Sequence, residues 1–148
     1  SSTLKYKDIY ATTFYGTATE AYYADLAENY LADNLYEPGT VLVFGGESEV
    51  TTTKVKGDRA VAGIVSTNPA HLMNSALSGN NVTALALQGR VPCKVIGFVM
   101  KGDLLVTSAV PGYAIVDNNP KVGTVIGKAL ETKTGTERGV IEIVVGKH

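Results

Sequence analysis

Residues 37–46 read EPGTVLVFGG, and the pattern in this stretch decides the fold class. A turn signal, Glu37-Pro38-Gly39, precedes the apolar, β-branched run Val41–Phe44, and the pair Gly45-Gly46 ends it. Short runs of this composition between glycine and proline clusters are typical of β-strands joined by tight turns. The stretch therefore predicts a short strand with a turn on each side.

The same unit recurs to the end of the chain, and it predicts a compact all-β barrel or sandwich over residues 37–148. Two pairs of segments also echo each other: 37–43 resembles 101–106, and 62–65 resembles 126–130. The sequence leaves open whether the domain consists of two related β-halves. The further predicted strands are Val50–Lys56, Ala60–Ser66, Val82–Gln88, Val91–Ile96, Leu104–Thr107, Tyr113–Val116, Thr124–Leu130 and Val140–Val145.

One segment has a helical pattern instead. Asn68-Pro69 is a favourable helix start, because Asn caps free backbone amides and Pro suits the first turn. Apolar residues at 72, 73, 76 and 77 would then share one helix face, and Gly79 suits the C-terminal end. The pattern predicts one short helix over about residues 69–77.

The N-terminal part, residues 1–36, has a different composition from the rest. It contains seven of the eight tyrosines and few Leu, Ile or Val residues, so it lacks the material for a core of its own. Thr17 and Glu20 have the spacing of a helix capping box, but a lone hairpin or helix of this length is marginal in water. We expect an extended stem that packs against copies of itself, because aromatic residues are enriched at interfaces; contact with a carbohydrate ligand is the alternative. The predicted oligomer interface comprises Tyr6, Tyr10, Phe14, Tyr15, Tyr22, Tyr23, Leu26 and Tyr30.

Composition excludes several classes of function. The net charge is −1 with no cluster of Lys or Arg, which argues against nucleic-acid binding. The longest apolar runs, such as Val41–Phe44 and Ile141–Val145, are far shorter than the ~20 residues of a membrane helix, and the first residues have no signal-peptide pattern. Cys93 is the single cysteine, which excludes an intrachain disulfide, and it is predicted to be a buried, inert thiol.

The sequence gives little sign of catalytic or metal chemistry. His71 has no second His or Cys near it in sequence, so we expect a surface histidine rather than a metal ligand. Ser66 precedes the predicted helix start, where capping by Asn68 is the simpler account. The acids Asp25, Glu28, Asp33 and Glu37 are expected to form a solvated polar face. No catalytic residue, metal site or cofactor is therefore assigned.

Two turn segments are candidates for contact with a receptor, because binding residues are often carried on exposed loops. Each also fits an ordinary turn. The candidate residues are Asn80, Asn81, Asp117, Asn118 and Asn119.

Several motifs, in order, carry a resemblance to a known class of proteins. The most specific are Gly63–Pro69 (GIVSTNP) and Gly89–Pro92 (GRVP); 37–43, 101–105, 111–114 and 126–131 accompany them. Over about residues 20–145 the chain resembles the C-terminal β-domain of phage tail-fibre and other virion structural proteins. It is more distantly similar to the neck-appendage domain that acts as a self-cleaving peptidase with an intramolecular chaperone.

The resemblance implies a structural protein of a phage virion, the C-terminal domain of a trimeric tail fibre or spike. Its implied partners are two further copies of the chain, other virion proteins and a host-surface glycan or protein, with no membrane insertion. Two alternatives stay open: a self-cleaving maturation domain, for which Ser1 would be a cut end, and a capsid decoration protein. The helical tail that usually follows such β-domains is not seen after Ile141–Val145, and no cleavage residue is carried over.

Overall fold

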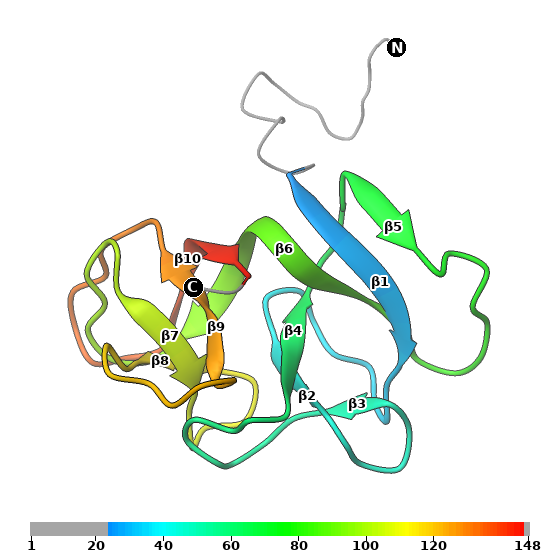
Figure 1. The fold of residues 1–148 in the computed structure, drawn as a ribbon, viewed down its shortest axis with the longest axis horizontal. Coiled ribbons are helices and arrows are strands. Elements are labelled where there is room, and N and C mark those ends of the chain that lie inside the picture. Colours follow the sequence, from blue (N-terminus) through cyan, green and yellow to red (C-terminus); the bar gives the residue numbers. More distant parts are fainter. Residues whose placement is uncertain (1–23, 147–148) are drawn as a thin grey trace, which may run out of the picture.

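The computed structural model describes residues 24–146, which form ten β-strands and no helix (Figure 1). The predicted all-β fold is therefore confirmed. No helix in this part of the chain is long and apolar enough to cross a membrane. The strands are β1 (Asp25–Leu31), β2 (Val41–Phe44), β3 (Val50–Thr51), β4 (Val61–Val65), β5 (His71–Met73), β6 (Val82–Val95), β7 (Leu104–Thr107), β8 (Ala114–Val116), β9 (Val125–Ala129) and β10 (Gly139–Val145).

Five strands close into a barrel, which we call the C-terminal barrel. The second half of β6 pairs with β10, and the order then continues through β9, β7 and β8. Parallel pairing of Val95 with Ala114 returns the sheet from β8 to β6 and closes it. The barrel interior contains Val95, Leu105, Ile126, Ile141 and Ile143, all at most 5% exposed.

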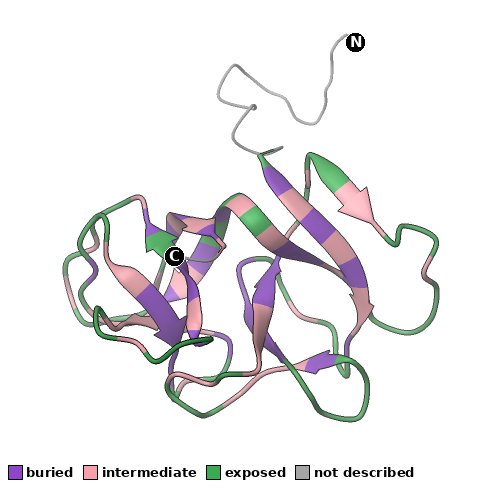
Figure 2. Cartoon of the chain, viewed as in Figure 1, coloured by how far each residue is buried: buried purple, intermediate pink, exposed green. Residues whose placement is uncertain are grey.

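The remaining strands form the N-terminal half, which lies on the other side of β6 (Figure 1). The first half of β6 pairs with both β1 and β4, and β4 continues through β2 to β3. A parallel bridge from Ala32 to Val50 links the end of β1 to β3. Burial alternates along β1 and most of β6, as expected for strands with two unlike faces (Figure 2). Ala32, Leu42, Val50, Val65 and Leu85 form the core of this half.

The two halves have the same strand order and share one bulge. In the N-terminal half, a bulge between Leu42 and Val43 interrupts the pairing of β2 with β4. In the C-terminal barrel, a bulge between Leu105 and Val106 interrupts the pairing of β7 with β9. The residues paired with these leucines are Gly63 and Gly127. The parallel closure recurs too, as the bridge between residues 32 and 50 and the pairing of residues 95 and 114. The sequence echo thus reflects two related β-halves, which share β6.

The same steric requirement explains both glycines. A Cβ on Gly63 would lie 2.3 Å from the Ala86 carbonyl oxygen, and one on Gly127 would lie 2.1 Å from the Val144 carbonyl oxygen. Both distances are far inside van der Waals contact, so neither position accepts a larger residue without a backbone shift. Repetition of this contact in the two halves indicates that it belongs to the repeated unit.

Strand β6 is continuous where the sequence pattern predicts two strands, Val82–Gln88 and Val91–Ile96. Gly89 lies at the junction, with a φ of +104°. A Cβ there would lie 2.2 Å from the Ala24 carbonyl oxygen, so only glycine allows this crossing. At this point β6 changes partners, from β1 to β10.

The predicted helix over about residues 69–77 is wrong. Residues His71–Met73 instead form β5, which pairs in parallel with Leu26–Glu28 of β1 (Figure 1). Asn74 then adopts a φ of +57°, which ends the strand, and its side-chain amide donates to the Asn29 carbonyl at 3.1 Å. Because a helix this short gains little by itself, pairing with the open edge of β1 determines the local structure.

Part of the predicted stem lies within the β-domain. Of residues 1–36, the structure describes 24–36, and these include β1, which pairs along its whole length with β6. Six of the predicted interface residues lie outside the described part of the chain: Tyr6, Tyr10, Phe14, Tyr15, Tyr22 and Tyr23.

Candidate functional site

A cleft of about 220 Å³ opens where β6 passes from one half of the fold to the other. Its apolar walls are formed by Pro38, Val65, Val91 and Pro92, together with the backbone of Gly39. Its polar groups come from four different elements: Asp25 of β1, Ser66–Asn68 after β4, Arg90 of β6 and Glu142 of β10. We call this site the Asp25 cleft.

Backbone hydrogen bonds fix the elements around the Asp25 cleft. The Ala70 amide donates to the Asp25 carbonyl at 2.8 Å, which ties the segment after β4 to the start of β1. The Ser66 amide donates to the Ala84 carbonyl at 2.8 Å. On the opposite side, the Gly39 amide donates to the Val65 carbonyl at 2.9 Å. The polar side chains therefore project from a rigid frame.

Asp25 has an unusual environment for a carboxylate. The residue is only 4% exposed, and its Oδ2 has no hydrogen-bond partner among the described residues. Burial raises the pKa of this carboxyl, and a hydrogen bond from Ser66 lowers it by less. A buried acceptor without a donor costs folding free energy, so a donor group placed at Oδ2 would stabilise the folded state.

Glu142 adds a second acceptor of the same kind. Its Oε1 is buried and makes no hydrogen bond within the described chain, although the Arg90 Nη1 lies 3.8 Å away. Burial raises the pKa of Glu142, Arg90 opposes this, and the neighbouring Glu131 raises the pKa further. Arg90 is therefore near enough for attraction but too far to satisfy the oxygen.

The residues that line the cleft bring carboxyl, hydroxyl, amide and guanidinium groups together with apolar walls. This arrangement suits recognition of a small polar molecule by hydrogen bonds. Among residues 24–146, no group of three or more His, Cys, Asp or Glu side chains is arranged to hold a metal ion.

The four acids that were expected to form one solvated face have four different environments. Asp25 is buried, so the expectation is wrong for it. Glu28 accepts a hydrogen bond from the Tyr30 hydroxyl at 3.1 Å, and Glu37 pairs with Lys94. Asp33 accepts from Tyr36 at 2.5 Å, and this bond lowers its pKa; a second bond comes from Thr51 at 2.7 Å.

The predicted interface residues that the structure describes, Leu26 and Tyr30, are both partly buried within the β-domain. The Tyr30 ring packs against the core of the N-terminal half and meets Phe44 edge-on, with ring centroids 5.5 Å apart. In this protomer, Tyr30 thus contributes to the fold itself.

The candidate receptor residues are not brought together. Asn80 and Asn81 lie in the β5–β6 connection, while residues 117–119 follow β8 in the C-terminal barrel (Figure 1). Both groups have local structural roles. Asn81 has a φ of +57°, and Asn118 accepts from the Leu104 amide at 2.9 Å and donates to Asp103 at 3.0 Å.

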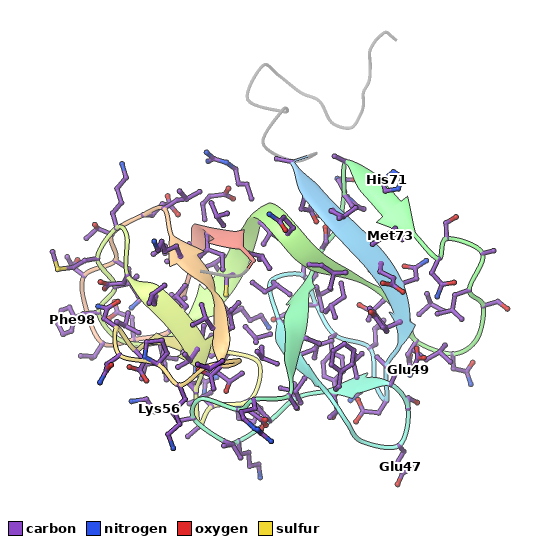
Figure 3. All side chains as sticks on the ribbon, in the orientation of Figure 1. Glu47, Glu49, Lys56, His71, Met73 and Phe98 are labelled. Atoms are coloured by element: carbon purple, nitrogen blue, oxygen red, sulfur yellow. The ribbon has the colours of Figure 1, made fainter. Side chains whose placement is uncertain are left out.

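His71 and Cys93 lie in opposite environments, one exposed and one buried. His71 is exposed on β5, near Met73 and away from the C-terminal barrel (Figure 3). Cys93 is fully buried in the barrel core, and burial raises the pKa of its thiol far above the ordinary value. The expectation of a buried thiol is confirmed, and its lack of reactivity stays a prediction.

A larger groove of about 770 Å³ lies between the two halves, beside the equivalent strands β4 and β9. Its lining is mostly apolar and contains no buried polar side chain among the described residues. The lining includes Val61, Gly63, Leu87, Val122, Val125 and Val145.

Comparison with known proteins identifies the fold. No protein-family model and no curated protein matches the chain. A solved structure, the C-terminal fragment of gene product 12 of bacteriophage phi29, superposes with a TM-score of 0.61 at 15% identity. The match covers 83% of this chain and 100% of that fragment. The N base of head fiber gp8.5 from bacteriophage phi29 gives a TM-score of 0.48 at 14% identity, over 80% of this chain and 92% of that chain.

Proposed function

We propose that this chain is a structural protein of a phage virion and forms the end of a trimeric tail fibre or spike. The observation that carries the proposal is the shared fold: the β-domain matches the whole of a C-terminal fragment of a phage protein. The motifs that suggested virion structural proteins from sequence agree with this: 63–69 spans the end of β4 and the segment after it, and 89–92 lies in β6.

The tyrosine-rich residues before β1 supply the proposed contact between copies. Residues 1–23 precede a β-domain in which the described residues form two hydrophobic cores. Each tyrosine that becomes buried between copies removes a large apolar area from water, which offsets the entropy of ordering the segment. In this proposal the β-domain is the distal head, and its exposed turns at 80–81 and 117–119 face the host.

Light scattering on the purified protein tests the assembly. The full chain should have three times the protomer mass, and a variant that begins at residue 24 should have a lower mass at the same concentration. The truncation leaves β1 intact, so circular dichroism should report the same β-domain in both. A full chain that is monomeric at micromolar concentration contradicts the trimer, and an equally stable truncated trimer contradicts the role of residues 1–23.

A further inference from the structure

We propose that the groove of about 770 Å³ between the two halves holds the tyrosine-rich segment of a neighbouring copy, with Tyr22 and Tyr23 in the groove and Glu20 beside Lys121. We call it the inter-half groove. Its lining comes from β4, β6, β9 and β10 and from residues 120–123 of the β8–β9 connection. The inference rests on the proposed function, because the neighbouring copy belongs to the proposed trimer, and it names the surface that the segment contacts.

The two halves of the fold line the inter-half groove with equivalent apolar residues. The members of one pair each lie two residues before the glycine that pairs with the leucine at the bulge. The members of the other pair each follow the carbonyl group that this glycine faces. These pairs are Val61 with Val125 and Leu87 with Val145. Each half therefore contributes one apolar wall to the groove.

The inter-half groove is open to solvent and large enough for several side chains. Val122 in its lining is 95% exposed. The volume of about 770 Å³ lies within the roughly 300–1,000 Å³ of sites that bind small molecules. An open apolar surface of this kind is typical of contact with another chain segment.

The composition of the tyrosine-rich segment matches this lining. Residues 9–23 contain five aromatic residues and a single charged one, Glu20. Among the described residues, the lining also contains a single charged side chain, that of Lys121. Tyrosine rings offer an apolar face together with a hydroxyl group, which suits a groove that is apolar inside and open to water. The segment and the groove are therefore complementary both in apolar surface and in charge.

The position of β1 favours a neighbouring copy as the source of the segment. Gly89 of β6 pairs with Asp25 of β1 and also with Val145 of β10, so β1 and β10 lie at opposite edges of β6. Val145 lines the groove, which places the groove on the β10 side. The segment of the same chain begins on the other side and would have to turn back across β6. The segment of a neighbouring copy has no such constraint, and three equivalent contacts of this kind close a ring.

Disulfide cross-linking of the full chain tests the contact. The double variant Y22C/V122C should form a covalent trimer under mild oxidation, seen by denaturing electrophoresis without reductant, because each copy would join to the next. The native Cys93 is fully buried and should not interfere.

A matched control uses another exposed valine. Val140 is 60% exposed and lies five residues before Val145 on β10, or roughly 16 Å along the strand. Y22C/V140C should give no covalent trimer. Y22C alone reports any direct contact between the copies of residue 22, and circular dichroism shows that each variant keeps the β-domain.

Charge reversal tests the ion pair in the Y22C/V122C background. K121E should slow formation of the covalent trimer about two- to fivefold, the size expected for one exposed ion pair. Adding E20K to K121E should restore the rate. K101E changes an exposed lysine in the turn before β7, outside the groove lining, and should leave the rate unchanged.

The results separate this inference from the proposed function. A protein that light scattering shows to be trimeric overturns the inference alone if Y22C/V122C gives no cross-link, gives only disulfides within one chain, or cross-links no better than Y22C/V140C. The same holds if K121E has no effect or if E20K does not restore the rate. A monomeric protein refutes the trimer, and the inference with it.

Discussion

Replacing Asp25 with Asn should make the folded protein more stable at neutral pH. The carboxyl is buried and its Oδ2 has no donor among the described residues, so the native state disfavours the charged form of this group despite the hydrogen bond from Ser66. An unsatisfied buried group costs about 1–3 kcal/mol, and the Asn amide recovers only part of this because it needs an acceptor of its own. We expect D25N to gain on the order of 1 kcal/mol in unfolding free energy, or about 2–4 °C in Tm for a domain of this size.

The stability gain of D25N should depend on pH, because the pKa of Asp25 differs between the folded and unfolded states. Burial raises the folded-state pKa of Asp25 above the unfolded value of 3.8. The folded state therefore binds the proton more tightly, and stability is highest below the unfolded pKa and falls as pH rises through the folded pKa. The gain of D25N should be largest above the folded-state pKa of Asp25 and shrink as pH falls toward 3.8.

Urea denaturation of the parent protein, D25N and E47Q between pH 4 and 8 measures the effect. Glu47 is exposed, so E47Q should match the parent at every pH. If D25N is no more stable than the parent at pH 7, or if its advantage is the same at pH 4 as at pH 7, the native state does not disfavour the charged form of Asp25.

Further variants test the fold. G89A should lower the unfolding free energy by roughly 1–3 kcal/mol more than G102A does. Both positions have a positive φ, but only Gly89 faces a backbone carbonyl. Equal urea midpoints for the two variants would contradict the crossing described for β6. G63A and G127A should each destabilise, because the added methyl meets a carbonyl oxygen in both halves, and a neutral effect in either would argue against equivalent halves. Cys93 should resist iodoacetamide in the native protein and react in urea, since its thiol is buried and its pKa is raised; modification of the native protein by intact mass would refute this.

Much of the β-domain follows from local sequence. Strands β2 and β7 begin and end where the turn signals place them, because each is a β-branched run between turn residues. Strands β1 and β5 were not predicted. Asp25–Leu31 alternates polar and apolar residues but adjoins the tyrosine-rich segment, and His71–Met73 becomes a strand only because an edge of β1 is available to it.

The candidate site was harder to predict, since its polar groups come from positions that are distant in sequence. Asp25 and Glu142 approach the same cleft only because β6 pairs with β1 along one half and with β10 along the other. Two sequence motifs, 63–69 and 89–92, indicated part of the site, because they contribute Ser66–Asn68 and Arg90 to the lining of the cleft. No local pattern marks Asp25 as a buried carboxyl.

Immunogold electron microscopy of intact virions tests the central claim most directly. An antibody raised against the β-domain, residues 24–146, should place gold particles at the free ends of fibres or spikes. Gold spread evenly over the capsid surface, or virions that carry no label although the antibody recognises the purified protein, would contradict the assignment of this chain to a fibre end.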